Sequence, residues 1–395
     1  MMKKTMHRGI SLYPGLGRSR EENLARLEQA AALGFTDLFL SFHIPETDEG
    51  AFAEQVNELL ERAAALGLRT VGDLVPGKAV PVSLTCLRLD DGYTPEAMAA
   101  LQARYPGKIL VLNASALTEN QLQAMEKAGV ALFRVEALHN FYPHPHTGLS
   151  EAYFQKQNGL LHRYGVKVGA FVPSRKGCRG PLYEGLPTME KDRHRAVRLA
   201  ARHALLLGAD AVYMGDDGPS EDELRQLAAM DPDVVKLDLV TEQKTELHDI
   251  LQTHIYETRP DEAEDVIRTT NSRALWKNIP IPDCLIETSD VRCQTSGTCG
   301  SILSPTSNVL TPDNKFCHLS SVISSQNRPA DHSLLPPGTL TLDSDAYGRY
   351  KGELEITLTE LPYDERTIIL GRIPEEELFL LEYLRGGRKF RICVD

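Results

Sequence analysis

Near its start the sequence reads GISLYP (9–14), then EENLARLEQAAALGF (21–35), then DLFLSF (37–42). The first and last of these segments are short and apolar and are bounded by turn residues, as β-strands are. The middle segment repeats its apolar residues at helical spacing and carries a glycine, Gly34, near its end, as amphipathic helices do. A strand, a helix and a strand in this order predict a β–α–β unit, the building block of a parallel sheet.

The same alternation continues to about residue 240. Six further strand candidates follow, separated mostly by helical segments, and they are RTVGDLVP (69–76), SLTCLRLDDG (83–92), KILVLNAS (108–115), ALFRVEALHNF (131–141), VKVGAFVPS (166–174) and AVYMGDD (211–217). Eight strands with intervening helices predict an α/β fold, a (β/α)8 TIM barrel, with a doubly wound open sheet as the alternative. One connection, GKAVPV (77–82), is too short for a helix, so either a helix is missing there or the strand count is off by one.

The chain is predicted to have four parts. Residues 1–240 form the catalytic barrel, and residues 241–280 form a helical bridge that begins the second domain. Residues 281–336 are rich in Ser, Thr, Pro and Asn and have weak periodicity, which indicates an irregular or poorly ordered insertion. Short strand-like runs with turns in residues 337–395 predict a small β domain.

The composition is typical of a globular protein and excludes several classes. The 395 residues include 42 % hydrophobic and 25 % charged residues, and the net charge of −12 argues against binding to nucleic acid or to an anionic membrane. No run approaches about 20 apolar residues, and no apolar segment follows the basic N-terminus. We therefore expect no membrane span, no signal peptide and a cytoplasmic location. The seven cysteines contain no CxxC pair, which favours reduced thiols over a zinc site.

The active site of a TIM barrel lies at the C-terminal ends of its strands. Polar side chains stand at almost every predicted strand end of this chain, namely Tyr13, Ser41, His43, Asp73, Arg88, Asp90, Asp91, Asn113, Ser115, Glu136, His139, Asn140, Ser174, Arg175, Lys176, Asp216 and Asp217. A polar ring at this position predicts an enzyme.

Carboxylates within this ring are the catalytic candidates. Asp73, Asp90 and Glu136 follow or end neighbouring strands, and Glu184 lies in the loop after the seventh strand. Two of them could serve as acid and base, or as acid and nucleophile, in glycoside cleavage. Each could instead cap a helix or join an ion pair. The other aspartates of the ring lie in turn-like DDG and GDDG sequences and are interpreted as turn residues.

The loop HNFYPHPHTGLS (139–150) follows the sixth strand and is rich in rings. Tyr142 and its neighbouring phenylalanine suit a sugar face, and His139 and Asn140 can bind sugar hydroxyls. The alternative is that the aromatic residues close the barrel mouth and the histidines are solvated. The loop histidines lack carboxylate partners, so no metal site is predicted. Further substrate-binding candidates on neighbouring strand ends are Arg88, Asn113 and Ser174.

The loop SRKGCRGPLYEGLPTMEKDRHR (174–195) is basic within an acidic chain. Arginine grips phosphate with two parallel hydrogen bonds, so this loop is the predicted phosphate site unless it is simply a solvated surface. The phosphate-binding candidates are Arg175, Lys176 and Arg179, helped by Arg349 and Lys351 of the small domain. Neither GxxxxGK[ST] nor a GxGxxG after a strand occurs, so nucleotide cofactors lack support and no cofactor is predicted.

Four long motifs together resemble one known family. They are HNFYP and TGLS in 139–150, GAFVPS (169–174), GPLYEGLPTMEKDRHR (180–195) and DSDAYGRYKGELEI (343–356). The chain is similar over residues 8–280 and 336–395 to the 6-phospho-N-acetylmuramidases, first known as a family of "outer surface protein" homologues of unknown function. The family usually has a fuller helical connection after the strand that holds Asp73, and it lacks the Cys- and Ser-rich tract at 284–330.

The resemblance implies a TIM barrel followed by a cyclophilin-like β domain. It also implies a cytosolic hydrolase that cleaves N-acetylmuramic acid 6-phosphate from N-acetylglucosamine during cell-wall turnover. The expected partner is this phosphorylated amino sugar, and whether the protein is a homodimer is left open. Two alternatives remain. One is a sugar-phosphate lyase or isomerase, which needs a lysine such as Lys176 or a metal at a strand end. The other is a peptide-binding small domain with the barrel as scaffold.

Overall fold

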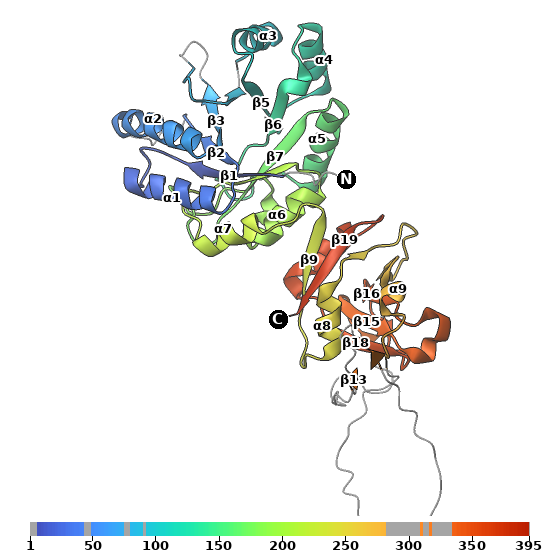
Figure 1. Ribbon diagram of the computed structural model, residues 1–395. Coiled ribbons are helices and arrows are strands. Elements are labelled where there is room, and N and C mark those ends of the chain that lie inside the picture. Colours follow the sequence, from blue (N-terminus) through green and yellow to red (C-terminus); the bar gives the residue numbers. More distant parts are fainter. Residues whose placement is uncertain are drawn as a thin grey trace, which may run out of the picture. The chain divides into compact units, whose positions relative to one another are not determined.

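The computed structural model divides into two compact units, Met1–Pro232 and Asp233–Asp395, and each is described by itself (Figure 1). The residues that the structure describes are 6–42, 49–74, 80–89, 92–281, 309–310, 316–317 and 334–394. Within them, no helix is long and apolar enough to cross a membrane.

The first unit is a closed barrel of eight parallel strands in sequence order. The strands are β1 (His7–Leu12), β2 (Asp37–Leu40), β3 (Arg69–Leu74), β4 (Cys86–Leu89), β5 (Ile109–Asn113), β6 (Val135–Leu138), β7 (Lys167–Val172) and β8 (Ala211–Met214). Because β8 pairs with β1, the sheet has no open edge. The predicted TIM barrel is confirmed, and the doubly wound open sheet is wrong.

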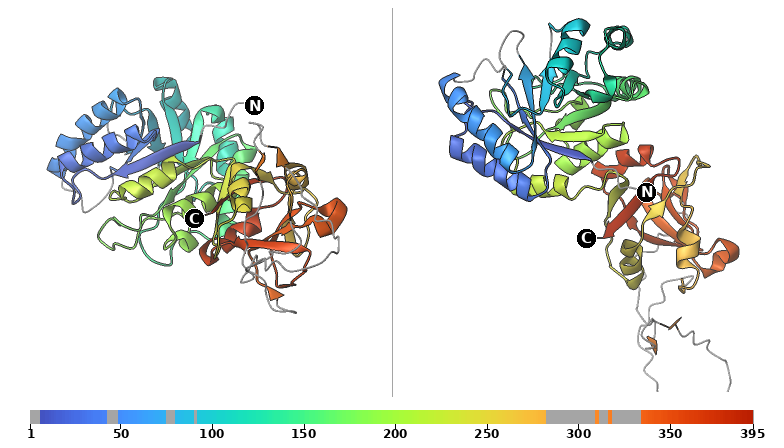
Figure 2. Two further views of the ribbon diagram at one scale, coloured as in Figure 1. Left: turned by 60° about the horizontal axis from the view of Figure 1, so that its bottom comes forward. Right: turned by 45° about the horizontal axis from the view of Figure 1, so that its top comes forward.

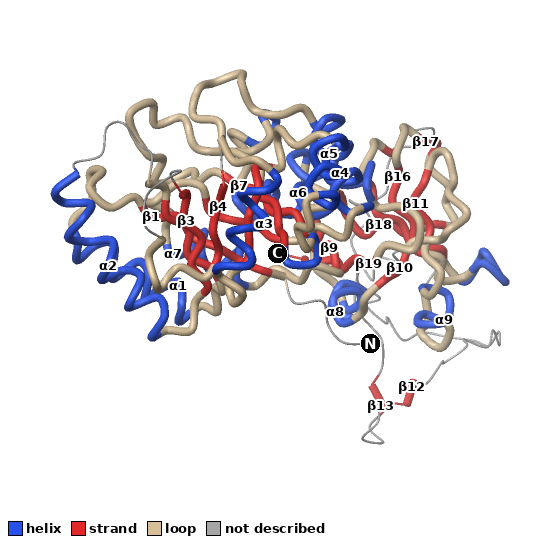
Figure 3. Tube along the Cα trace, turned by 90° about the horizontal axis from the view of Figure 1, so that it is seen from above, coloured by secondary structure: helices blue, strands red, loops and turns tan. Residues whose placement is uncertain are grey.

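Helices lie outside the strand ring (Figures 2 and 3). They are α1 (Arg20–Ala32), α2 (Glu49–Ala65), α3 (Pro95–Arg104), α4 (Glu119–Lys127), α5 (Glu151–Arg163), α6 (Val197–Leu206) and α7 (Glu221–Ala228). Ser19, Thr118 and Ser220 begin their helices with capping boxes, which satisfy backbone N–H groups of the first turn. Between β3 and β4, the described residues 80–85 contain no helix. The strand count was therefore correct, and the short connection lacks a helix over its described part.

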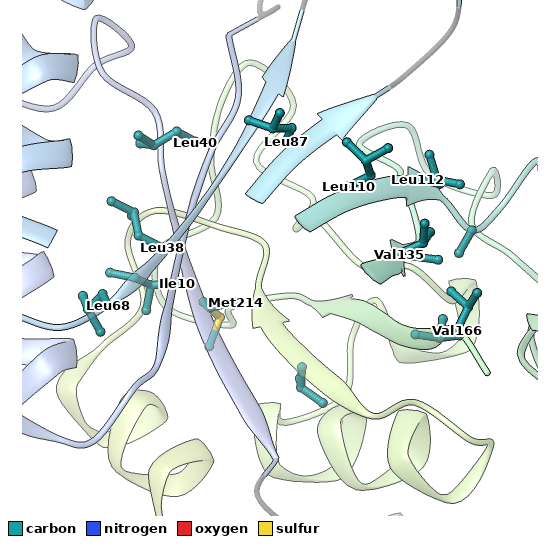
Figure 4. Close-up of a cluster of buried hydrophobic side chains, with 14 of the residues drawn as sticks. Ile10, Leu38, Leu40, Leu68, Leu87, Leu110, Leu112, Val135, Val166 and Met214 are labelled. Atoms are coloured by element: carbon teal, nitrogen blue, oxygen red, sulfur yellow. The ribbon is translucent and has the colours of Figure 1, made fainter. Parts of the chain in front are cut away.

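Side chains of each barrel strand alternate between two cores. Leu38 and Leu40 of β2 point outward to the helices and join the cluster of Figure 4. Phe39, between them, points into the barrel, where its ring centroid lies 5.1 Å from that of Phe171. The barrel interior is thus filled by aromatic and aliphatic side chains, and its two ends are separate polar environments.

Over its described residues, the second unit consists of small sheets and the helices α8 (Glu246–Thr253) and α9 (Ser272–Trp276). One sheet has the order β10-β19-β9 and another β11-β16-β15-β18. Their strands are β9 (Val234–Leu239), β10 (Tyr256–Glu257), β11 (Val266–Arg268), β15 (Thr339–Asp343), β16 (Leu354–Thr357), β18 (Thr367–Arg372) and β19 (Lys389–Val394).

Strand β9 explains where the second unit begins. It pairs in parallel with β19 at the far end of the chain, so the unit starts at Asp233, before the expected position 241. Of the proposed insertion 281–336, most residues lie outside the described part of the chain. Likeness to cyclophilin stays a prediction.

Replacing Leu38 by Ala tests the outer core. This side chain is fully buried, so we expect the free energy of unfolding of the barrel unit to fall by about 2–5 kcal/mol. Val82, which is 92 % exposed, provides the control, and Val82→Ala should change stability by less than about 0.5 kcal/mol. Urea denaturation followed by circular dichroism measures both. If both substitutions changed the free energy of unfolding by the same small amount, the described packing of Leu38 would be contradicted.

Candidate active site

Arg88 centres a buried polar network at the C-terminal ends of the strands. Its Nη1 donates to Oδ1 of Asp73 at 2.8 Å, and its Nη2 donates to Oδ1 of Asn140. The hydroxyl of Ser41 donates to the other carboxylate oxygen of Asp73 at 3.1 Å. Arg88 and Asp73 are each 5 % exposed. The predicted candidates Asp73, Arg88 and Asn140 are therefore brought together, and both oxygens of Asp73 already accept hydrogen bonds.

His139 lies beside this network but faces away from the mouth. Its side chain is fully buried against α5, with Nε2 3.0 Å from Oδ1 of Asn158 and its ring 4.6 Å from that of Phe154. Its Nδ1 lies 3.1 Å from the Ser115 hydroxyl, which also accepts the backbone N–H of Asn140. The predicted position of His139 at the open mouth is wrong, because the residue after β6 points outward by strand alternation. Its role here is to hold the backbone of Asn140.

Glu136 lies at the opposite end of the barrel from the mouth. A 3₁₀ turn occupies Leu132–Arg134, so β6 begins only at Val135 and Glu136 is its second residue. There Glu136 accepts a hydrogen bond from Nη2 of Arg69 at 2.6 Å. The predicted position of Glu136 at the catalytic face is wrong, because the segment before Val135 was interpreted as strand.

Arg69 also neutralises a second carboxylate, that of Asp37, at this N-terminal end of the barrel. Its Nη1 lies 3.8 Å from the fully buried carboxylate of Asp37. The same carboxylate lies 3.1 Å from Nδ1 of His7 and accepts the Tyr213 hydroxyl at 2.5 Å. Loss of one partner from such a set would leave an uncompensated buried charge, which is costly. Polar residues at the N-terminal end of a TIM barrel serve stability.

The carboxylate of Asp216 organises the basic loop after β7. It accepts the backbone N–H groups of Ser174 and Arg179 at 2.8 Å each and that of Leu186 at 3.2 Å. Burial raises the pKa of Asp216 to about 6, although the three N–H groups act in the opposite direction. Sequence reasoning interpreted Asp216 as a turn residue. The signal that could have found it is its position at the end of β8 beside the long loop.

The Ser174 side chain is also used within the protein. It is fully buried, and its hydroxyl donates to Glu223 at 2.9 Å. The same hydroxyl accepts the backbone N–H groups of Lys176 and Gly177 at 3.1 and 2.9 Å. The structure therefore places Ser174 inside the loop and away from the mouth, contrary to the predicted substrate contact. It shapes the turn that leads to Arg179.

Arg193 ties this loop to the ring-rich loop after β6. Its guanidinium is 1 % exposed and donates to the backbone oxygens of Tyr142 and His144 at 3.0 and 3.1 Å. It also pairs with both carboxylate oxygens of Glu190 at 2.7 Å. The guanidinium holds the pKa of Glu190 at about 2. Arg193 belongs to the basic loop 174–195, but its guanidinium is used for contacts within the protein.

Arg179 is the basic residue of the loop that faces a cavity. The cavity has a volume of about 360 Å³ and is lined by residues of the β1–α1, β7–α6 and β8–α7 connections and of the first turn of α1, among them Arg18, Glu22, Cys178, Arg179, Tyr183 and Asp217. The guanidinium carbon of Arg179 lies 4.4 Å from the ring centre of Tyr13 and 5.4 Å from that of Phe141. Its Nη1 is buried and has no hydrogen-bond partner among the described residues.

The remaining candidates do not line this cavity. Arg175 and Lys176 are exposed, and Nη1 of Arg175 lies 3.2 Å from Nδ1 of His194. Glu184 is exposed, and Tyr142 is half-buried. Asn113 accepts the backbone N–H of Ser115 at 3.0 Å.

Four of the residues named from the sequence are not placed at this site. Asp90 lies outside the described residues, as does His43. Arg349 and Lys351 belong to the second unit, where Arg349 stacks on Tyr350 and Lys351 pairs with Asp345 at 2.6 Å. The described residues contain no group of three or more side chains that could hold a metal ion. Cys86, Cys178 and Cys393 are free thiols.

Fold and site define a TIM-barrel protein with a polar, arginine-containing cavity at the mouth. The family model described as "6-phospho-N-acetylmuramidase, N-terminal" matches residues 8–229, and its C-terminal counterpart matches residues 234–294 and 317–393. The chain therefore belongs to the 6-phospho-N-acetylmuramidase family, whose name is that of a glycosidase. No curated protein matches the chain.

Two solved structures resemble the chain over nearly its whole length. An uncharacterized protein of B. cereus is 24 % identical, with 99 % of this chain and 100 % of that chain covered and a TM-score of 0.78. A conserved protein of unknown function from Enterococcus faecalis is 26 % identical, with 98 % and 96 % covered and a TM-score of 0.66. The shared architecture thus includes both units of the chain.

Acid should destabilise the protein through His139. Burial lowers the pKa of this imidazole from 6.5 to about 4, so the unfolded chain binds its proton first as the pH falls. The stabilisation is complete above pH 6.5 and lost towards pH 4, at a total cost of about 3 kcal/mol. The free energy of unfolding should therefore fall more steeply between these pH values in the wild type than in His139→Gln. His144→Gln, at an exposed position, should follow the wild type, and equal slopes in all three proteins would contradict this account.

A methyl group at Gly177 should disrupt the loop. A Cβ built there lies 1.7 Å from the backbone oxygen of Gly218, so the β7–α6 and β8–α7 connections must separate. We expect Gly177→Ala to lower the melting temperature and any catalytic activity together. Gly159→Ala is the matched control, because a Cβ meets nothing within 4 Å on this exposed face of α5 and should stabilise the helix by up to about 1 kcal/mol. Normal behaviour of Gly177→Ala would show that the two loops are not closely packed.

Proposed function

We propose that the protein hydrolyses the glycosidic bond between N-acetylmuramic acid 6-phosphate and N-acetylglucosamine in the cytoplasm, as part of cell-wall turnover. Membership of the family supports the reaction class. The observation that carries the substrate assignment is the Arg179 guanidinium. It is held between two rings at the edge of a cavity, with an Nη1 donor that has no partner among the described residues.

Arg179 suits a phosphate for a physical reason. A buried N–H without a partner costs free energy, and a phosphate oxygen would recover it through a charge-assisted hydrogen bond. The rings of Tyr13 and Phe141 fix the guanidinium plane, so little conformational entropy is lost when the anion binds. The backbone N–H of Arg179 is fixed as well, through Asp216.

The network around Arg88 provides the second part of the proposed site. Asn140 is held by Arg88 on one side and by Ser115 on the other, so its amide is fixed for hydrogen bonds to a sugar hydroxyl or acetamido group. Asp73 keeps a carboxylate in the same network, where it can orient the sugar or stabilise positive charge that develops on it. Hydrolysis further needs an acid that protonates the leaving oxygen and a carboxylate that acts as nucleophile or base.

A lyase or isomerase that uses a lysine is less well supported. Lys176, the lysine nearest a strand end, is exposed and does not line the cavity. The hydrolase therefore remains the proposed function.

The test compares the 6-phosphorylated disaccharide with its unphosphorylated form. We expect the wild type to release N-acetylglucosamine from the phosphorylated form only. Arg179→Met should lower kcat/KM for this substrate by about 10–100-fold, the effect of one charge-assisted hydrogen bond. Lys176→Met is the matched control and should have little effect. Equal cleavage of both disaccharides would exclude the phosphate site, and cleavage of neither would exclude the proposed function.

A further inference from the structure

The aspartates at the mouth differ in whether they line the cavity beside Arg179. Asp73 accepts hydrogen bonds on both oxygens, and Asp216 accepts three backbone N–H groups. Neither lines the cavity beside Arg179, whereas Asp217 does. Asp217 was interpreted as a turn residue in the sequence. Its position therefore raises the question of what a carboxylate does at the wall of the proposed phosphate pocket.

Asp216 and Asp217 are neighbours with different surroundings. Both follow β8, and their side chains contact different connections of the barrel. Asp216 turns toward the loop residues 174–186 and holds it. Asp217 turns toward the β1–α1 connection, where its Oδ1 lies 3.3 Å from Nε of Arg18. Asp216 thus fixes the backbone of the loop, and Asp217 lines the cavity beside it.

The surroundings of Asp217 suit a carboxyl group that gains and loses a proton. The residue is 5 % exposed, and burial raises the pKa of its carboxyl group, while Arg18 and then Arg179 act in the opposite direction. A phosphate bound on Arg179 would cancel part of that opposing charge and favour the protonated acid further. The phosphorylated substrate would then help to keep Asp217 protonated, in the form that its own cleavage requires.

We propose that Asp217 is the general acid of the hydrolysis, a role that rests on the proposed function. The bond between the anomeric carbon of the muramic acid and the glycosidic oxygen breaks, and its electron pair stays on that oxygen. The Asp217 carboxyl proton moves to this oxygen, and N-acetylglucosamine leaves. The oxygen of a water molecule becomes bonded to the anomeric carbon, directly or after a glycosyl intermediate, and the water proton restores the acid. One water is consumed, and no oxidant or reductant is needed.

Leaving groups separate a general acid from a structural residue. The disaccharide has a poor leaving group that needs the proton, whereas an aryl glycoside with a dinitrophenol leaving group does not. In Asp217→Asn we expect kcat/KM for the phosphorylated disaccharide to fall by about 10²–10⁴-fold. For the 2,4-dinitrophenyl glycoside of N-acetylmuramic acid 6-phosphate it should stay within about 10-fold of the wild type. Asp216→Asn is the comparison, because loss of the loop should impair both substrates alike.

Each outcome decides between the two proposals. If the wild type cleaves both substrates and Asp217→Asn loses both equally, or keeps the disaccharide, Asp217 is not the acid while the proposed function stands. If the wild type cleaves neither substrate, both proposals are overturned. Melting curves establish that Asp217→Asn is folded.

The wild type alone supplies a second measurement if that variant does not fold. The fall of kcat/KM at high pH should appear with the disaccharide and be absent with the dinitrophenyl glycoside. It should also be missing from Asp217→Asn where that protein is folded. An identical alkaline fall with both substrates overturns the role of Asp217, because deprotonation of the acid should matter only for the leaving group that needs it.

Discussion

The mouth of the barrel depends on one carboxylate, that of Asp216. It gathers backbone N–H groups from Ser174, Arg179 and Leu186, three points of a loop that has little regular structure of its own. A loop with unpaired backbone groups would be costly to bury, and Asp216 satisfies three of them at once. Because Asp216 follows β8, the rigid barrel itself fixes the backbone of Arg179. The positions of the cavity, of the Arg179 guanidinium and of the neighbouring Asp217 all depend on this contact.

The filled interior divides the barrel into two ends with different roles. At one end Arg69 neutralises Asp37 and Glu136, and the charges are paired with each other. At the other end Arg88 pairs with Asp73, but Nε of Arg88 and Nη1 of Arg179 are buried donors that the described residues do not satisfy. Buried polar groups are normally satisfied, so each unsatisfied donor at the mouth requires an explanation, and the proposed anion would provide one for Arg179. The aromatic layer of Phe39 and Phe171 separates the two ends.

Much of the fold could be predicted because its signals are local. The apolar periodicity of β1, α1 and β2 is visible within segments of a few residues, and the eight strands were found in the correct order. The capping boxes at Ser19 and Ser220 act within four residues. Where the prediction was wrong, the cause was a boundary. Three residues of 3₁₀ turn before β6 shift the strand start, and Glu136 moves from the catalytic face to the opposite end.

By itself the sequence determined the barrel and the set of polar residues available at its mouth, since strand and helix periods depend on neighbours along the chain. Only the tertiary structure decided which of them remain available for a substrate. Asp216 meets Ser174 across 42 residues and Arg88 meets Asn140 across 52, so no local pattern reports that these groups are already paired. As a result of hydrogen bonds between distant segments, Arg179 and Asp217 line the cavity. Ser174, His139 and Arg193 are buried and do not line it.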